Sequence, residues 1–381
     1  MTEEQSIFLV LCLIYLSECV KSVPVGSVIF HFSWSGRWRV SLPNEYLSHP
    51  TRQLIFLNPI PALRTYVLAH SAPISVSTVG VSAATSQRLA LGHSVNDLHL
   101  AFTHEHVRHV ESRGQRLLVN GLTFGKCGSE TDAQAWVALI QRTSHQPIAK
   151  REQLILEFLL QRFTKQSALQ RLHELTGSLT RLRLLCFALF IFLYLIAPLA
   201  VSMFGLPRAF LPLGLALGLG TLSIAATYFS AHSRLYPNAL RERIANAVKI
   251  TVYPPLAIRA VDHISMNAMT GFHPVLLGVL LLNADAVGFV RHVLKNLEHV
   301  GRNMEKNDLS SSIMSGYAQL ELKTCRDFLR SQYLDVLEKI EASPPWDGVS
   351  RAYCPRCLCY YTIYPGECAD CRGVALRTFN E

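Results

Sequence analysis

The chain has 381 residues, of which 50% are hydrophobic and only 17% charged, and its mean hydropathy is +0.23. This balance excludes an ordinary soluble globular protein and indicates segments that lie in a membrane. The formal net charge of +9 suits nucleic acid, anionic lipid or the cytoplasmic flanks of membrane helices. We favour the flanks, because membrane topology gathers Lys and Arg there.

The first apolar run extends from Ile7 to Val20 and is short for a membrane span. Its start is acidic, with Glu3 and Glu4, and the residues after it offer no A-x-A cleavage site for a signal peptidase. We therefore predict an uncleaved N-terminal membrane anchor over residues 5–22, with its start outside and Lys21 in the cytoplasm.

Residues 23–147 are predicted to form a strand-rich α+β domain, because Val, Thr, Ser and aromatic residues are frequent and Pro and Gly often interrupt them. The dipeptides Arg113-Gly114 and Asn120-Gly121 are typical of hairpin turns. A helix is expected from Glu130 to Arg142, where apolar residues share one face. The expected strands are 28–32, 38–42, 54–57, 65–69, 74–81, 98–103, 107–111, 116–119 and 122–125.

Residues 148–182 have helical periodicity and form a connector to the most apolar part of the chain. The run from Leu184 to Phe204 has about 20 uncharged residues, enough to cross a ~30 Å hydrocarbon core. A second run from Phe210 to Ser230 follows closely. Two transmembrane helices, at 183–204 and 209–231, are therefore predicted to form a tight antiparallel hairpin.

Basic residues flank this hairpin on both sides, whereas its connection holds Arg208 alone. The positive-inside rule therefore predicts that the large domains are cytoplasmic, at a bacterial inner or plasma membrane. In the second helix Gly214 and Gly218 form a GxxxG pair, and such small residues let another helix approach closely. The simpler interpretation packs the pair against the first helix of the same hairpin, and the alternative is a homo-oligomer seam.

After the hairpin, residues 232–342 are predicted to form an α-helical cytoplasmic domain. The apolar run from Pro274 to Val290 could be a further span, but Asp285 and its polar neighbours bring its insertion free energy near zero. We interpret it as a buried helix of the soluble domain. Residues 343–352, rich in Pro and Gly, form a linker.

Cysteines supply the most specific motif. Five of the ten lie in the last part of the chain, and four of these make two CxxC pairs, Cys354 with Cys357 and Cys368 with Cys371. Each pair can turn two thiolates toward one point, and two pairs complete the tetrahedron that Zn²⁺ prefers. Redox pairs and disulfides are the alternatives. Cys359 is either a bystander or a competing thiol.

Residues 353–379, with these two pairs, resemble zinc-ribbon domains, and no family is recognised for the rest of the chain. The resemblance implies a structural Zn²⁺ held by Cys354, Cys357, Cys368 and Cys371. Four protein ligands leave no open coordination position, so the site is expected to stabilise the fold and not to catalyse.

Histidines offer no comparable motif. The segment His104-Glu105-His106 begins like a zinc-protease HExxH helix, but Arg108 stands where the second histidine belongs, and the surrounding alternation predicts a strand with surface histidines. His263 and His273 lack a third ligand and are interpreted as structural. Walker A, GxGxxG and GxSxG motifs are absent from the sequence, so no catalytic or cofactor-binding residue is predicted.

The expected function is that of a membrane-anchored interaction or scaffold protein, whose partners are the lipid bilayer and another protein. The alternative is a membrane enzyme of unknown chemistry at the cytoplasmic face, acting through polar residues such as His232, Arg234, Arg241, Glu242 and Arg243. A second alternative, nucleic-acid binding through the ribbon, is disfavoured by the mixed charges around the cysteines.

Overall fold

The computed structural model describes residues 3–24, 27–33, 37–41, 48–49, 52–61, 63–70, 74–84, 99–127, 129–302, 308–342, 344, 346–355, 358–369 and 374–379. The chain divides into two compact units, each built from two separate stretches of sequence. Unit 1 comprises Met1–Ala69 and Lys165–Gly271, and unit 2 comprises His70–Thr164 and Phe272–Glu381. The strand-rich stretch 23–147 and the helical stretch 232–342 each contribute to both units. Sheets in the N-terminal part and a mostly helical C-terminal part are as expected.

Unit 1 opens with helix α1 (Glu3–Cys19), which passes directly into strand β1 (Val20–Pro24). Two three-stranded sheets follow, in the orders β1-β5-β4 and β3-β2-β6. One buried cluster between these strands contains Val23, Leu57, Tyr66 and Leu68. The strands expected near 28–32, 38–42, 54–57 and 65–69 are confirmed. The remaining strand bounds are β2 (Ser27–Ser33), β3 (Trp38–Ser41), β4 (Ser48–His49), β5 (Arg52–Phe56) and β6 (Arg64–His70).

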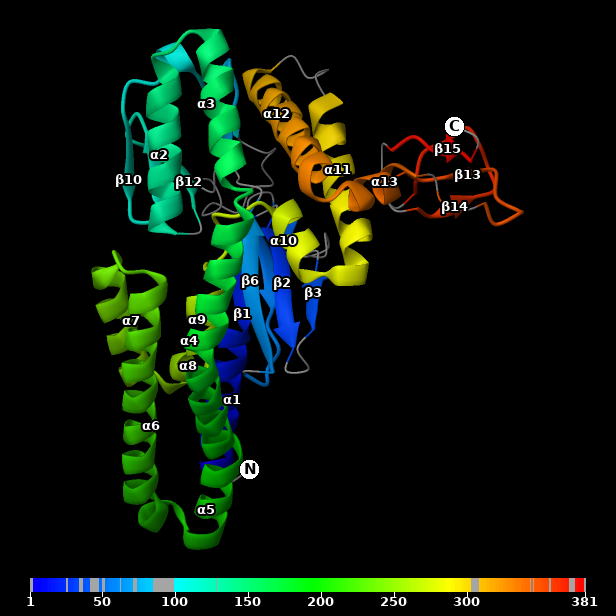
Figure 1. The fold of residues 1–381 in the computed structure, drawn as a ribbon. Coiled ribbons are helices and arrows are strands. Elements are labelled where there is room, and N and C mark those ends of the chain that lie inside the picture. Colours follow the sequence, from blue (N-terminus) through cyan, green and yellow to red (C-terminus); the bar gives the residue numbers. More distant parts are fainter. Residues whose placement is uncertain are drawn as a thin grey trace. The chain divides into compact units, whose positions relative to one another are not determined.

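The helical hairpin belongs to unit 1, and its two arms lie side by side (Figure 1). Its first arm runs through α4 (Lys165–Ile191), the π-turn η4 (Phe192–Ile196) and α5 (Ala197–Phe204), and its second arm is α6 (Leu206–Leu235). Both arms are long and apolar enough to span a membrane. Gly205, with φ of 76°, makes the reversal between them, because glycine has no Cβ to oppose that conformation.

The π-turn has a local cause in Pro198, which stands in the first turn of α5. Proline has no backbone N–H to donate, and its ring collides with the carbonyl of the residue four positions earlier, here Tyr194. Widening the helix by one residue at Phe192–Ile196 relieves that collision and lets the helix continue.

Three shorter helices complete unit 1: α7 (Leu240–Val252), α8 (Pro254–Ile258) and α9 (Ala260–Ser265). Helix α7 runs back along α6. The Arg243 guanidinium lies 5.2 Å from the centre of the Phe229 ring, and Asn246 donates to the Tyr228 hydroxyl at 3.2 Å. The chain thus returns along the second arm of the hairpin after Leu235.

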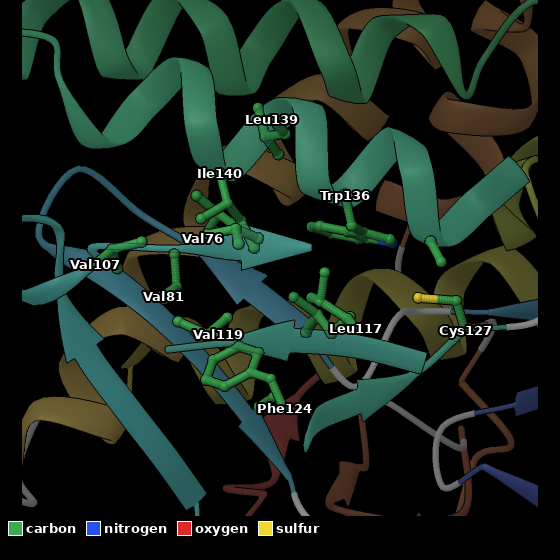
Figure 2. Close-up of a cluster of buried hydrophobic side chains, with 14 of the residues drawn as sticks. Val76, Val81, Val107, Leu117, Val119, Phe124, Cys127, Trp136, Leu139 and Ile140 are labelled. Atoms are coloured by element: carbon green, nitrogen blue, oxygen red, sulfur yellow. The ribbon is translucent and has the colours of Figure 1, made fainter. Parts of the chain in front are cut away.

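In unit 2 the sheets β7-β8-β9 and β10-β11-β12 share one buried core with helices α2 (Glu130–Ser144) and α3 (Ile148–Gln161). Figure 2 shows Trp136 and Ile140 of α2 pointing toward Val76, Leu117 and Val119 on the strands, and all five side chains are buried in one cluster. The strands are β7 (Ile74–Val76), β8 (Gly80–Ala84) and β9 (His99–Thr103) in one sheet, and β10 (Val110–Arg113), β11 (Arg116–Val119) and β12 (Leu122–Lys126) in the other.

The prediction of one strand over 74–81 is wrong, because a hairpin turn interrupts it. The Ser77 N–H donates to the Gly80 carbonyl at 2.9 Å, and the Ser77 hydroxyl accepts from the Val79 N–H. At Gly80 a Cβ would lie 2.1 Å from the Phe102 carbonyl oxygen, so β8 and β9 can approach only where this side chain is absent.

The buried character predicted for Pro274 to Val290 is confirmed, since Val275, Leu276 and Leu277 are fully buried. The prediction of one helix is wrong. Asn283, with φ of 46°, breaks the run, and asparagine tolerates this left-handed conformation better than most residues. The helical part of unit 2 consists of α10 (Pro274–Leu281), the 3₁₀ turn η5 (Asn283–Asp285), α11 (Ala286–Arg302), α12 (Leu309–Gln332) and α13 (Leu334–Glu341).

Candidate functional site

The cysteine-rich end of unit 2 is a small antiparallel sheet. Strand β13 (Ala352–Tyr353) lies between β14 (Tyr360–Tyr361) and β15 (Arg377–Thr378). Cys354 and Cys368 are 0% and 2% exposed, and both belong to one buried cluster with Ala352 and Leu376. The first cysteine of each CxxC pair therefore lies in the same small core.

The backbone turns back sharply after Cys354. The Leu358 N–H donates to the Cys354 carbonyl at 2.9 Å, and the Cys354 N–H donates to the Cys359 carbonyl at the same distance. Leu358 has φ of 62°, which a branched side chain adopts only where its surroundings impose it, as at ligand-binding turns. A tight reversal at this place is what two cysteines of a CxxC pair need to face one point.

A second clasp holds the chain around Cys368. Its N–H donates to the Val374 carbonyl, and the Leu376 N–H donates to the Gly366 carbonyl, both at 2.9 Å. The Tyr361 hydroxyl lies 3.0 Å from the Cys368 sulfur. These bonds hold Gly366 and Cys368 against Leu376 and Val374, so the backbone around Cys368 is fixed by the residues after the second CxxC pair.

Two of the predicted zinc ligands, Cys357 and Cys371, lie outside the described residues. In the described part of the chain no group of three or more His, Cys, Asp or Glu side chains is arranged to hold a metal ion. The donor chemistry at Cys354 and Cys368 fits Zn²⁺, since both are buried thiols in one core. Cys359 is exposed and is not among the buried residues of that cluster. The four-cysteine site remains a prediction.

The histidine segment differs from the expected strand of surface histidines. His104–His106 forms a 3₁₀ turn, η3, before β10 begins at Val110. His104 is buried and its Nε2 lies 2.7 Å from the Ser77 carbonyl oxygen, and burial lowers its pKa. Its neighbours His106 and His109 are exposed. The expectation is therefore wrong for His104, which joins η3 to the hairpin turn that follows β7.

A buried polar group that the sequence did not indicate joins α10 to α12. His273 Nε2 lies 2.8 Å from Glu321 Oε1, the Cys325 sulfur lies 3.8 Å from the same nitrogen, and Phe163 stacks on the imidazole. The composition resembles a Cys-His-Glu catalytic group. Its geometry does not, because the Val275 N–H donates to Nδ1, which leaves the proton on Nε2 for Glu321.

Neither imidazole nitrogen of His273 is therefore available to accept the Cys325 proton. Burial also raises the pKa of the Cys325 thiol, whereas a nucleophilic cysteine needs a lowered one. The three side chains are at most 3% exposed, so a substrate does not reach them. The interpretation of His273 as structural is consistent with these contacts.

In unit 1, Arg259 is a buried centre of polar contacts that no sequence pattern indicated. Its guanidinium donates to Asp262 at 2.9 Å, to the Cys19 sulfur at 2.8 Å and to the Asn58 carbonyl at 2.6 Å. The Tyr15 ring lies 5.4 Å from the guanidinium carbon. One side chain thus ties α1, the segment after β5 and α9 together, through residues far apart in the sequence.

Two of the five polar residues named for the enzyme alternative, His232 and Arg243, have structural contacts at the end of α6. Arg243 donates to the Tyr236 and Pro237 carbonyls at 3.2 and 3.1 Å, and His232 is buried between the Tyr228 and Tyr236 rings. Arg234, Arg241 and Glu242 are exposed. These contacts end a helix and do not favour a catalytic role.

No family model, no curated protein and no solved structure matches this chain.

Proposed function

We propose that this chain is a membrane-anchored interaction protein, with the hairpin and α1 in the bilayer, the other parts in the cytoplasm and a zinc ribbon at the C-terminal end. The observation that carries the proposal is the apolar surface of the hairpin. Leu195, Leu199, Phe210 and Leu215 are 58–70% exposed. Large exposed apolar patches are rare on soluble monomers, whereas lipid tails cover such a surface without cost.

Helix α1 supports a third membrane element. Its Leu11 carbonyl accepts from the Tyr194 hydroxyl at 3.3 Å, and the Tyr15 ring lies 5.7 Å from that of Phe190. The N-terminal helix therefore lies along the first arm of the hairpin, within its apolar part. Ile7 and Leu13 remain 47% and 58% exposed, as expected for side chains that meet lipid.

The topology of this arrangement gives the first testable prediction. We expect a cysteine introduced at Arg208, in the first turn of α6, to react with a membrane-impermeant maleimide in intact cells. A cysteine at Glu338, exposed on α13, should react only after permeabilisation, because the positive-inside rule keeps that side cytoplasmic. The parent chain, with its native cysteines, serves as the control. Labelling of Glu338→Cys in intact cells would overturn the proposed orientation.

The glycine pair of α6 gives a second prediction. A Cβ at Gly214 or Gly218 would meet no atom within 4 Å, whereas one at Gly220 would lie 3.2 Å from Leu189. Gly214 and Gly218 therefore do not pack closely against the first arm. Of these three glycines, Gly220 is the one that does. The open pair supports the alternative, a homo-oligomer seam.

We expect Gly214→Leu and Gly218→Leu to abolish a dimer, measured by crosslinking in native membranes, without unfolding the monomer. Leu240→Ala, on the exposed face of α7, is the matched control and should leave crosslinking unchanged. Equal crosslinking of the parent chain and both glycine variants would exclude this seam.

The interaction function itself is tested by crosslinking followed by affinity purification from native membranes. We expect a stoichiometric protein partner that is retained by the parent chain and lost by a Cys354→Ser variant, if the ribbon stabilises or presents the binding surface. Recovery of a lipid or metabolite that the purified protein chemically converts would instead favour the membrane enzyme.

A further inference from the structure

A cavity of about 260 Å³ lies within unit 2, where helices α11, α12 and α13 meet the ribbon. Its size is near the lower end for small-molecule sites, which span roughly 300–1,000 Å³. Five cationic side chains line it, against two acidic ones. The cations are Arg291, Lys295, Arg302, Arg326 and Arg377, and the acids are Glu298 and Glu341.

One of the two carboxylates in this lining is already engaged in ion pairs. Glu298 accepts from Lys295 at 2.9 Å and from Arg326 at 2.5 Å. The remaining charged groups of the lining are three arginines, Arg291, Arg302 and Arg377, and the carboxylate of Glu341. They come from different elements, since Arg291 and Arg302 are on α11 and Arg377 is on β15.

Arg291 is the most deeply placed of the three, at 7% exposed. Its guanidinium donates to the Ile340 carbonyl at 3.1 Å and to the Lys339 carbonyl. These carbonyls belong to the last turn of α13, whose partial negative charge offsets only part of the positive charge. Burial makes the remaining charge costly. Burial accordingly lowers the pKa of Arg291. An anion in the cavity would supply the charge that the backbone does not.

The rest of the lining is apolar and comes from both sides, with Leu294 and Ile340 from the helices and Pro355 and Leu358 from the ribbon. Seven of the fourteen described lining residues are charged, so the cavity is more polar than most small-ligand sites and suits a charged ligand. An arginine guanidinium can donate two parallel hydrogen bonds to a phosphate or carboxylate group. It therefore selects an oxyanion by geometry as well as by charge.

We propose that this cavity binds the oxyanion group, phosphate or carboxylate, of a small organic ligand, with Arg291, Arg302 and Arg377 holding the oxyanion and the apolar wall holding the remainder. The site spans the helices and the ribbon, so its occupant would stabilise the ribbon against the helical part of unit 2. The proposal goes beyond membrane anchoring and does not depend on it.

Calorimetric titration of the full-length protein in a neutral detergent tests this site, with inorganic phosphate and citrate as probes and sodium chloride of equal ionic strength as the reference. We expect one or both probes to bind, and Arg302→Ala and Arg377→Ala each to weaken binding by about 10-fold, the loss of one charge-assisted contact. Binding of phosphate alone or citrate alone identifies the oxyanion.

The matched control is Arg330→Ala, which removes a cation from the exposed face of α12, where it pairs with Asp327 at 3.3 Å. This variant should bind as the parent chain does. Arg302 is not in the ribbon, so its variant reports on binding even if Arg377→Ala disturbs β15. Heat equal to that of sodium chloride, or an equal loss in Arg330→Ala and Arg302→Ala, would overturn the proposal.

Discussion

Replacing Cys354 by Ser is expected to release a bound zinc ion from the purified protein and to unfold the ribbon while leaving the rest of the chain folded. The buried core of the ribbon contains Ala352, Cys354, Cys368 and Leu376, too few side chains to offset the conformational entropy of the segment. Metal binding, worth about 10–16 kcal/mol in structural zinc sites, would supply most of its folding free energy. Metal analysis and hydrogen exchange of residues 350–379 measure both effects.

The matched control is Cys359→Ser. Cys359 is exposed, so this variant should keep the metal and its exchange protection, as a thiol outside the ligand set would. Cys368→Ser should behave like Cys354→Ser. Loss of zinc in the Cys359 variant would change the assigned ligands, and a parent protein that is metal-free and protected from exchange under reducing conditions would exclude the zinc site.

The second large effect is expected at Glu321, on the buried face of α12. Glu321→Ala should lower the free energy of unfolding by about 3–5 kcal/mol, the usual cost of breaking a buried polar pair. The substitution leaves the His273 N–H without its acceptor at 2.8 Å and removes a negative charge that acts on buried Arg162. Glu321→Gln keeps an acceptor oxygen and should cost clearly less. Denaturant unfolding of the full-length protein measures the difference, and equal stabilities of the two variants would contradict it.

The same pair predicts how stability depends on pH. Burial lowers the pKa of His273 below its ordinary 6.5, so below pH 6.5 the unfolded chain takes up a proton that the folded chain refuses. Burial alone would raise the pKa of Glu321, but the hydrogen bond from His273 and the charge of Arg162 hold it below 4.5. Both groups therefore stabilise the fold at neutral pH.

Stability is expected to be lost progressively as the pH falls below about 6.5, because in that range the unfolded state binds more protons than the folded state. In His273→Asn, which can still cap α10, the decline between pH 6.5 and 5 should be shallower. Denaturant midpoints measured across this range report the slope. If the variant and the parent chain had equal slopes, protonation of His273 would not be the cause of the decline in stability.

Local structure in this chain follows from neighbouring residues and could therefore be predicted. Strand β11 coincides with the expected 116–119, because Asn120 and Gly121 accept the positive φ angles, 53° and 79°, that a two-residue hairpin turn requires. The two apolar runs of the hairpin and the helix beginning at Glu130 likewise depend on composition and period alone.

Contacts between distant residues were decided by the tertiary structure. The break at Asn283, the burial of His104 and the turn at Ser77 depend on what packs against them, and a short apolar run does not distinguish one helix from two. Arg259 meets Cys19 and Asn58 across 240 and 201 residues, and the arginines of the cavity come from two helices and a strand. Such sites form only when the core brings separate elements together, because burial supplies the free energy that holds their charges in place.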